Sequence, residues 1–276
     1  MSRTIRVSAV TPEIRIGDLD GNLARVRAAL CAIEQCGPQL VVLPELATSG
    51  YVFADADEAR SLALRADDER LTALAGAVPE GAVTVVGFCE VDGELLYNSA
   101  IVFGDGRALG CYRKSHLWAA ESTIFATGPE AGTIIDTPVC RLGVAICYDN
   151  EFPETPRRLA LGGAEVLALP VNWPLVPRPD GERAPEIIQA MAAARSSQLA
   201  TVIADRRGQE RGVRWTDGTA VIGADGWIQA TPGVGEIVAT AVLELTGDKT
   251  IGEFNDVIGD RRPELYGDLT VPESLD

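Results

Sequence analysis

The sequence has few of the residues on which several common catalytic mechanisms depend. It contains one histidine, His116, and six cysteines with no C-x-x-C pair. Zinc sites built from two or three histidines are therefore excluded, and any Ser-His-Asp or Cys-His arrangement must use His116. No G-x-S-x-G, G-x-G-x-x-G or P-loop motif is present. We expect neither a metal nor a cofactor.

Positive charge and long apolar runs are also scarce. Lys plus Arg total 24 against 40 Asp plus Glu, a formal net charge of −16, and Lys114 and Lys249 are the only lysines. Such a chain repels phosphate backbones and anionic lipid, so nucleic acid and membranes are not expected partners. No stretch of 18 apolar residues occurs, and the first residues lack the apolar segment of a signal peptide. The sequence thus predicts a cytoplasmic protein with reduced thiols.

Segments with strand and helix character alternate along the 276 residues. This pattern predicts an α/β fold with a mixed sheet, in one domain spanning 1–276. A proline-rich loop at 173–185 is expected near a site or an interface. Strands are expected at 6–10, 40–43, 82–90, 95–103, 107–113, 141–147, 166–169, 201–204, 220–222 and 236–243, and helices at 22–35, 56–76, 153–161 and 185–199.

Three apolar segments each end on a reactive residue: Glu45, Lys114 and Cys147. Sites in open α/β sheets form at the carboxyl ends of strands, so these side chains are expected in one pocket. A thiolate is a strong nucleophile, but it needs a proton acceptor and a nearby positive charge. Glu45 would accept the proton, and Lys114 would stabilise the thiolate and then an oxyanion.

Each of these residues also has an ordinary structural interpretation. Glu45 alone is typical of a surface acid after a strand, and Lys114 of a solvated lysine. Cys147 alone is typical of a buried structural thiol, which is what we expect of the other five cysteines. His116 lies two residues from Lys114, and a cationic neighbour disfavours protonated imidazole, so we expect a structural hydrogen-bonding role rather than a general base.

Six motifs in order resemble the nitrilase superfamily of carbon–nitrogen hydrolases, over nearly the whole chain. The glutamate, lysine and cysteine segments carry most of the likeness. The motifs are Leu43-Pro44-Glu45 with Gly50-Tyr51, Asn98-Ser99-Ala100, Tyr112 to Leu117, Gly143 to Asp149 with Phe152-Pro153-Glu154, Pro170 to Trp173, and Arg261 to Tyr266.

The resemblance implies a four-layer α-β-β-α sandwich that pairs as a homodimer or a higher homo-oligomer, with the C-terminal tail, about 246–276, at an interface. It implies that Glu45, Lys114 and Cys147 are catalytic, through a Cys thioester. Glu121 is carried over as a second glutamate, and the backbone N–H of Tyr148 as an oxyanion donor. Residues near the motifs are candidates to line the substrate pocket or to pack the core: Tyr51, Trp118, Phe125, Asn172 and Trp173.

The chain departs from the family pattern at two positions. Asp205 takes the place of an Asn in Asp205-Arg206-Arg207-Gly208, and Asp217-Gly218-Thr219 replaces a Gly-x-Ser segment. Both positions support or shape the pocket in the family. The resemblance therefore implies the chemistry of the reaction more firmly than the preferred substrate.

Tyr148-Asp149 after the cysteine resembles the aliphatic amidase branches rather than true nitrilases, which tend to have Trp-Glu there. We therefore expect hydrolysis of a small aliphatic primary amide to a carboxylic acid and ammonia. The alternatives are an N-carbamoyl amine or amino acid amidohydrolase, for which Arg178 or Arg183 would supply a cation to an acidic substrate, and a nitrilase. A catalytically silent binding or scaffold protein of the same fold is the non-enzyme alternative.

Overall fold

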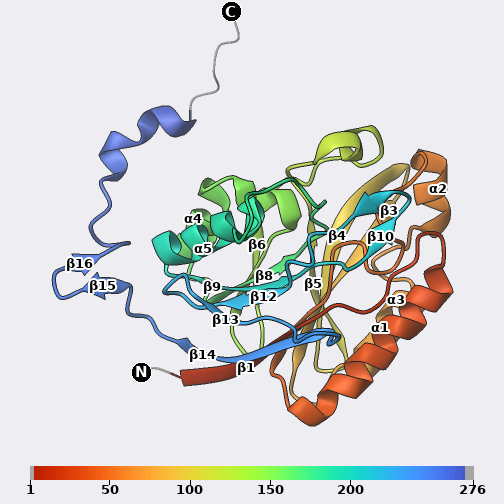
Figure 1. Ribbon diagram of the computed structural model, residues 1–276, viewed down its shortest axis with the longest axis horizontal. Helices are drawn as coiled ribbons and strands as arrows, with labels where there is room; N and C mark the ends of the chain where they lie inside the picture. Colours follow the sequence, from red (N-terminus) through yellow and green to blue (C-terminus); the bar gives the residue numbers. More distant parts are fainter. Residues whose placement is uncertain (1–2, 271–276) are drawn as a thin grey trace, which may run out of the picture.

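The computed structural model describes residues 3–270 and forms four layers, with two six-stranded sheets packed face to face between helices (Figure 1). The first sheet has the order β14 (Val238–Leu245), β1 (Arg3–Val10), β2 (Leu40–Val42), β3 (Val83–Asp92), β4 (Leu95–Gly104), β5 (Arg107–Arg113). The second has the order β13 (Ile228–Ala230), β12 (Ala220–Ile222), β9 (Ala200–Ala204), β8 (Val166–Pro170), β7 (Arg141–Val144), β6 (Thr133–Asp136). The α-β-β-α sandwich expected from the resemblance is confirmed.

The helices cover the outer faces of the two sheets. Helix α1 (Leu19–Ile33) lies on the first sheet, and α4 (Glu154–Leu161) and α5 (Pro185–Ser197) lie on the second. The other helices are α2 (Ala56–Leu62), α3 (Glu69–Thr72) and the 3₁₀ turns η1 (Glu34–Cys36), η2 (Ala73–Ala77), η3 (Ala119–Thr123), η4 (Cys147–Glu151), η5 (Pro263–Leu265) and η6 (Gly267–Thr270). Short ladders pair β10 (Gln209–Glu210) with β11 (Val213–Arg214) and β15 (Thr250–Gly252) with β16 (Asn255–Asp256).

Helix α1 forms for reasons that the sequence makes plain. Its N-cap Asp18 accepts a hydrogen bond from the Gly21 N–H at 3.1 Å, which satisfies one of the free donors of the first turn. Val26, Leu30 and Ile33 recur at helical spacing and are buried against the outer face of the first sheet. The inner faces of both sheets share one apolar core that includes strands β1, β2, β8 and β9.

Strand direction brings the predicted reactive residues to one edge. Strands β1, β2 and β3 are parallel in the first sheet, as are β7, β8 and β9 in the second. Strand β4 runs antiparallel to β3 and β5 antiparallel to β4, so β5 again runs with β3. The carboxyl ends of β2 and β5 therefore lie at the same edge of the first sheet.

Two expectations about local structure are wrong. Residues 56–76 do not form one helix, because the chain leaves α2 at Ala63 and Leu64 pairs with strand β3, donating its N–H to Cys89 O at 2.9 Å. The strand expected at 141–147 stops at Val144, and Cys147 begins η4 instead. Six short strands of two to four residues were not predicted, because such short pairings have little periodicity: β6, β10, β11, β13, β15 and β16.

All six cysteines are free thiols, and three of them are exposed: Cys31, Cys36 and Cys111. The expectation that the other five cysteines are buried holds only for Cys89 and Cys140. Cys31 lies on the outer face of α1, and Cys111 lies on β5 at the edge of its sheet, where neither meets the core. Within residues 3–270, no helix has the length and apolar character needed to cross a bilayer.

After β14 the chain leaves the body of the molecule. Figure 1 shows the segment from residue 246 to residue 270 running away from the sandwich through β15, β16, η5 and η6. Three large apolar side chains on it are exposed: Phe254, Leu265 and Leu269. The last residues of the tail expected at an interface, 271–276, lie outside the described residues.

Candidate active site

Glu45 follows β2 and is completely buried. The segment that carries it lies close against β3, with Leu43 N–H bonded to Val85 O and Ala47 N–H bonded to Gly87 O. A Cβ at Gly87 would lie 2.4 Å from Pro44 O and 2.6 Å from the Glu45 Cα. Only glycine leaves room there. Gly87 on β3 therefore allows the segment that carries Glu45 to pack directly against this strand.

Lys114 directly follows β5, and its side chain is fully buried. Its Nζ donates to Glu45 Oε1 at 2.7 Å and to Glu121 Oε1 at 2.8 Å. The backbone on either side is held as well, because Lys114 N–H donates to Asn98 O and Gly128 N–H donates to Lys114 O, both at 2.8 Å. One ammonium therefore bridges two buried carboxylates.

The two carboxylates have further partners. Asn98 Nδ2 donates to Glu45 Oε1 at 2.7 Å, while Glu45 Oε2 is buried and has no hydrogen-bond partner among the described residues. Glu121, on η3, accepts from the Tyr51 hydroxyl at 2.5 Å through Oε1 and from the Trp118 N–H at 3.2 Å through Oε2. Of the four oxygens of the two carboxylates, only Glu45 Oε2 thus has no partner among the described residues.

Cys147 is buried and adopts a left-handed backbone conformation, with φ +48°. Leu46, directly after Glu45, has φ +49°, and Ala119, two residues before Glu121, also has φ +49°. Side-chain-bearing residues rarely adopt this conformation, and such strain gathers at functional sites. It turns the chain sharply at three of the segments that meet here.

Asp149 ties the cysteine segment to the lysine segment. Its Oδ2 accepts from the Ile146 N–H at 2.9 Å and from the Tyr112 hydroxyl at 2.8 Å. Its Oδ1 accepts from Ser115 Oγ at 3.0 Å and lies 2.8 Å from His116 Nδ1. This role of Asp149 was not predicted, although the acid stands two residues after Cys147 in the cysteine motif. His116, stacked on Phe152, has a structural role as expected.

The ionisation of the cluster follows from its burial. Burial alone would lower the pKa of Lys114, but Glu45 and Glu121 raise it well above its ordinary value, so the lysine is charged. Burial raises the pKa of Glu45 to about 7, against the opposing effect of Lys114. A carboxyl group with a pKa near 7 both accepts and donates a proton at neutral pH.

The thiol of Cys147 rests in its protonated form. Burial raises its pKa well above the ordinary value, and the charges of Glu45 and Glu121 raise it further. Lys114 and the backbone N–H of Asn172 act in the opposite direction. A proton acceptor is therefore needed before this sulfur becomes a nucleophile.

A cavity of about 370 Å³ opens beside Cys147. Its walls include Trp118, Tyr148 and Trp173, together with Glu151 and Glu186. Tyr148 lies in the first turn of η4, where leading N–H groups have no partner within the turn.

Of the five residues considered for the pocket, Trp118 and Trp173 line this cavity, and the other three do not. Tyr51 bonds Glu121, and Asn172 donates from Nδ2 to Glu45 O at 2.9 Å. Phe125 packs in an apolar cluster with Leu46 and Cys89. Asn172 and Tyr51 thus hold the buried cluster rather than face the cavity.

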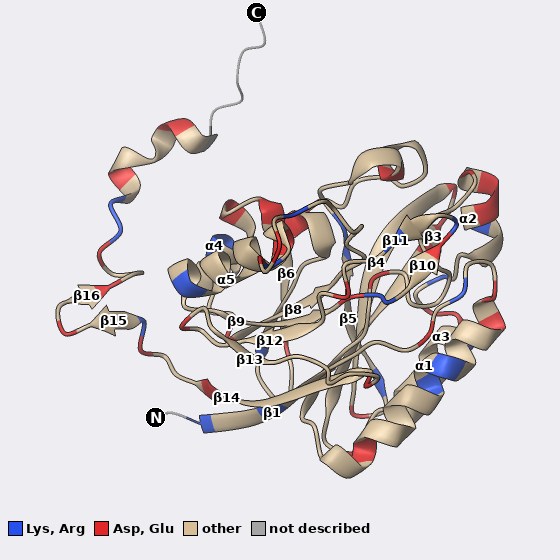
Figure 2. Cartoon of the chain, in the orientation of Figure 1, with Lys and Arg blue, Asp and Glu red and all other residues tan. Residues whose placement is uncertain are grey.

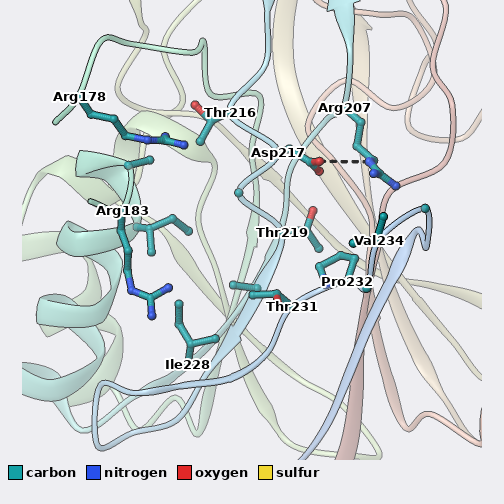
Figure 3. Close-up of a pocket in the computed structure, with 16 residues that line it drawn as sticks. Arg178, Arg183, Arg207, Thr216, Asp217, Thr219, Ile228, Thr231, Pro232 and Val234 are labelled. Atoms are coloured by element: carbon teal, nitrogen blue, oxygen red, sulfur yellow. Dashed lines mark hydrogen bonds and ion pairs between the residues drawn. The ribbon is translucent and has the colours of Figure 1, made fainter. Parts of the chain in front are cut away.

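Arg178 and Arg183 lie around a different cavity, of about 470 Å³ (Figure 3). In that view they approach it from the proline-rich loop and the start of α5, opposite an ion pair between Arg207 and Asp217 of 3.3 Å. Neither arginine lines the cavity beside Cys147. The idea that they supply a cation to a substrate at Cys147 therefore receives no support from their positions.

Asp205 holds the wall of the Cys147 cavity in place. It is completely buried and accepts three backbone N–H bonds, from Trp173 at 3.0 Å and Arg206 at 2.8 Å through Oδ1 and from Gly218 at 2.8 Å through Oδ2. A carboxylate has two acceptor oxygens for three donors, whereas an asparagine has one. The departure from the family pattern at this position thus has a visible structural use.

We expect Asp205→Asn to lower the free energy of unfolding by about 1–3 kcal/mol, because the new NH₂ group faces a buried N–H donor. Since Trp173 loses its anchor, KM should rise more than kcat falls. Urea unfolding and steady-state kinetics check both. Asp180→Asn, an exposed acid of the proline-rich loop, is the control and should change neither. Equal stability of the two variants would contradict the prediction.

Comparison with known proteins agrees with the fold and the motifs. The sequence model of the carbon-nitrogen hydrolase family matches residues 6–247. A nitrilase from Pyrococcus abyssi is 35% identical over 95% of this chain and 99% of its own, and an (R)-stereoselective amidase from a Pseudomonas species is 34% identical over 93% and 91%. The crystal structure of an amidase from a Nesterenkonia species is 25% identical, with a TM-score of 0.77 over 96% of each chain. This chain therefore belongs to the carbon–nitrogen hydrolase family, in the amidase-like part of the nitrilase superfamily.

Proposed function

We propose that the protein hydrolyses a small aliphatic primary amide to the carboxylic acid and ammonia, with Cys147 as the nucleophile. One observation carries the proposal: the Lys114 ammonium bridges Glu45 and Glu121, while Glu45 Oε2 has no hydrogen-bond partner among the described residues. The charge of Glu45 acts on the buried thiol of Cys147 and raises its pKa. A free base, a fixed cation and a protonated nucleophile are the three groups that acyl transfer to a cysteine requires.

In the first half of the reaction, Glu45 Oε2 takes the proton of the Cys147 thiol. The thiolate attacks the amide carbon and forms a C–S bond, while the electron pair of the C=O bond moves to oxygen. Lys114 and the Tyr148 N–H stabilise this oxyanion. As the C–N bond breaks, Glu45 returns its proton to nitrogen, so that ammonia leaves and a thioester remains on Cys147.

In the second half, Glu45 takes a proton from water, whose oxygen attacks the thioester carbon. The C–S bond then breaks, the acid leaves, and the proton returns to the sulfur. Glu121 keeps Lys114 in position and charged throughout, because it shares that ammonium with Glu45. The cycle consumes one water for each ammonia released and uses no group outside this chain.

The names of two relatives point to other possible substrate classes. An N-carbamoylputrescine amidase from Solanum tuberosum is 31% identical over 90% of this chain and 89% of its own, and the Pyrococcus abyssi relative is named a nitrilase. Carbamoyl amines release ammonia by the same two half-reactions, and the carbamic acid that remains breaks down to carbon dioxide and the free amine. Nitriles require addition to a C≡N bond. The Tyr148-Asp149 pair after the cysteine is less typical of the true nitrilases that catalyse this reaction.

Ammonia release from four matched sets tests the proposal: short primary amides, ω-amides, carbamoyl amines and nitriles of equal chain length. We expect turnover with amides and little or none with nitriles. Turnover of carbamoyl amines alone would replace the proposed substrate with the second candidate. Turnover of nitriles alone, or of nothing in the screen, would overturn the proposal.

The pKa of Glu45 predicts a pH profile. Only the ionised carboxylate accepts the thiol proton, so kcat/KM should rise with pH through a limb centred near 7 and level off above it. Two pH units below the limb, kcat/KM should be about 100-fold lower. Rates from pH 5 to 9 in buffers of constant ionic strength check this, and a flat profile between pH 5.5 and 8 would contradict it.

Asn98 supplies a test that the limb belongs to Glu45. Its Nδ2 bond stabilises the charged form of Glu45 and lowers that pKa. Asn98→Leu should therefore move the limb to higher pH, while an exposed change such as Glu94→Gln should leave it in place.

We also propose that the protein works as a homodimer or higher homo-oligomer in the cytoplasm, with the segment from about residue 246 onward packed on a second copy. Phe254, Leu265 and Leu269 are 83%, 61% and 68% exposed, which is unfavourable for an isolated chain. Lys249 and Val257 bond to Gln198 and Arg157 of the same chain, but the rest of the segment extends from the sandwich (Figure 1). We expect a second copy to cover these three side chains.

Replacing Phe254, Leu265 and Leu269 together with serine should lower the molecular mass measured by light scattering toward that of one chain. Leu95→Ser is the control, because Leu95 is also exposed but lies at the β3–β4 turn, outside the tail segment. An unchanged mass in the triple variant would remove the tail from the interface.

A further inference from the structure

The cavity beside Cys147 carries negative charge that nothing neutralises. Glu151 and Glu186 both line it, and no lysine or arginine does so among the residues that the structure describes. Glu151 lies on η4, four residues after the nucleophile, and Glu186 lies in the first turn of α5. Figure 2 shows acidic residues together with basic ones at the end of the molecule where α4 and α5 lie.

The two carboxylates lack protein partners. Neither forms an ion pair or a side-chain hydrogen bond within residues 3–270, and Glu186 Oε2 is buried without any partner. Glu151 is exposed on its outer side, and its partial burial still raises its pKa. The charge of Glu186 raises that pKa further, so the two groups repel each other. A buried carboxylate oxygen with no donor is unfavourable unless a ligand supplies one.

Helix stabilisation does not account for Glu186. An acid in the first turn of a helix interacts favourably with the helix dipole, but a capping role would place an oxygen on a backbone N–H. Glu186 Oε2 accepts no such bond. Arg183, three residues earlier, lines the cavity of Figure 3 instead and forms no ion pair with Glu186.

The remaining walls suit a cation with an apolar stem. Trp118 and Tyr148 meet edge to face at 4.9 Å between ring centroids, and Trp173 forms another wall. Aromatic faces attract ammonium groups, and Val176 with the adjoining prolines offers contact to methylene groups. A net charge of −16 favours the approach of cations to the molecule as a whole.

We propose that the substrate carries a protonated amine at the end remote from the scissile C–N bond, and that Glu151 and Glu186 bind this ammonium. The inference rests on the proposed amide hydrolysis and narrows its substrate class to primary amides with a terminal amino group and to N-carbamoyl diamines. The nucleophile and Glu151 share the turn η4, so the distance between the reacting carbon and the ammonium is set by a short, rigid segment.

The test compares three amides of equal length, 5-aminopentanamide, hexanamide and adipic acid monoamide, whose far ends are an ammonium, a methyl group and a carboxylate. We expect kcat/KM for the ammonium compound to exceed that for the methyl compound by about 10- to 100-fold, the gain typical of a hydrogen bond to a charged group. The carboxylate compound should be the poorest of the three. Butylammonium should inhibit competitively and butanol should not.

Charge-removing variants assign the preference to the two residues. Glu151→Gln and Glu186→Gln should each reduce the ratio of kcat/KM for the ammonium compound to that for the methyl compound, and the double variant should bring it close to one. Glu182→Gln, an exposed acid of the neighbouring loop, is the matched control and should leave the ratio unchanged.

A preference of the unaltered enzyme for the methyl or carboxylate compound would overturn the inference, as would a double variant with an undiminished ratio. These results differ from failure of the proposed function, in which none of the three amides is hydrolysed. The comparison of substrates on the unaltered protein needs no variant to fold.

Discussion

Replacing Cys147 with alanine should abolish amide hydrolysis, with kcat falling by about 10⁴-fold or more, the loss seen when a covalent nucleophile is removed. The free energy of unfolding should fall by about 1 kcal/mol at most, because the change removes only the sulfur atom of a buried, neutral thiol. Purified protein, an ammonia-release assay and thermal unfolding check both expectations. Both proteins are also incubated with an amide and quenched in acid. The parent protein should then show a mass increase on Cys147, and the variant should show none.

Cys140→Ala is the control for Cys147→Ala. Cys140 is also buried, in the same core, and its pKa is raised to about 12 by burial. It has no contact with Glu45 or Lys114, so its removal should leave the rate intact. If Cys147→Ala retained turnover, or if no acylated cysteine formed, the thioester mechanism would fail and a silent binding protein would become the better interpretation.

The sequence predicted the fold where pattern and topology are simple. Helix α1 follows from an Asp cap and apolar residues at helical spacing, and the β3–β4 hairpin follows from two β-rich runs joined at Gly93. The single helix predicted for 56–76 is wrong, although the composition of this segment favours one. Leu64 pairs with β3 instead, which interrupts the helix. Tertiary pairing overrode local propensity, as it often does in short segments.

The meeting of the three candidate catalytic residues was also predictable, but their supporting contacts were not. Glu45, Lys114 and Cys147 stand out because each follows an apolar strand, and strand direction alone places two of them at one edge. Nothing in the sequence shows that Gly87 admits the Glu45 segment. The pairing of Asp149 with His116, or of Asp205 with the Trp173 backbone, is equally hidden, because each joins residues at least 30 positions apart.

The cavity shows the same division. Trp118 and Trp173 were recognised because they lie beside the motifs, and for the same reason Phe125 was considered, although it packs in a core cluster. Glu186 lies 39 residues after Cys147 and reaches the cavity only because α5 begins beside η4. A residue whose role depends on the approach of two distant elements has no local signal to find.

The second large effect is expected at Lys114, where methionine keeps the length of the side chain and removes the charge. Lys114→Met leaves Glu45 and Glu121 buried against each other without their shared cation. Removing one partner of a buried ion pair lowers the free energy of unfolding by about 3–5 kcal/mol. Because the oxyanion loses its charged donor as well, kcat should fall by about 10³-fold or more.

The pH dependence of that loss separates an electrostatic cause from a packing defect. Lys114 lowers the pKa of Glu45, so without it the folded-state pKa of Glu45 rises. The folded variant then binds more protons than the unfolded chain, and its stability falls as pH increases. The deficit relative to the parent should therefore be largest above pH 8 and shrink toward pH 5. Lys249→Met, at the other lysine, which donates to Gln198 O at 2.7 Å, should cost about 1 kcal/mol at most and keep full activity. A deficit at Lys114 that stays constant from pH 5 to 9 would mean that the ammonium fills space rather than holds two charges together.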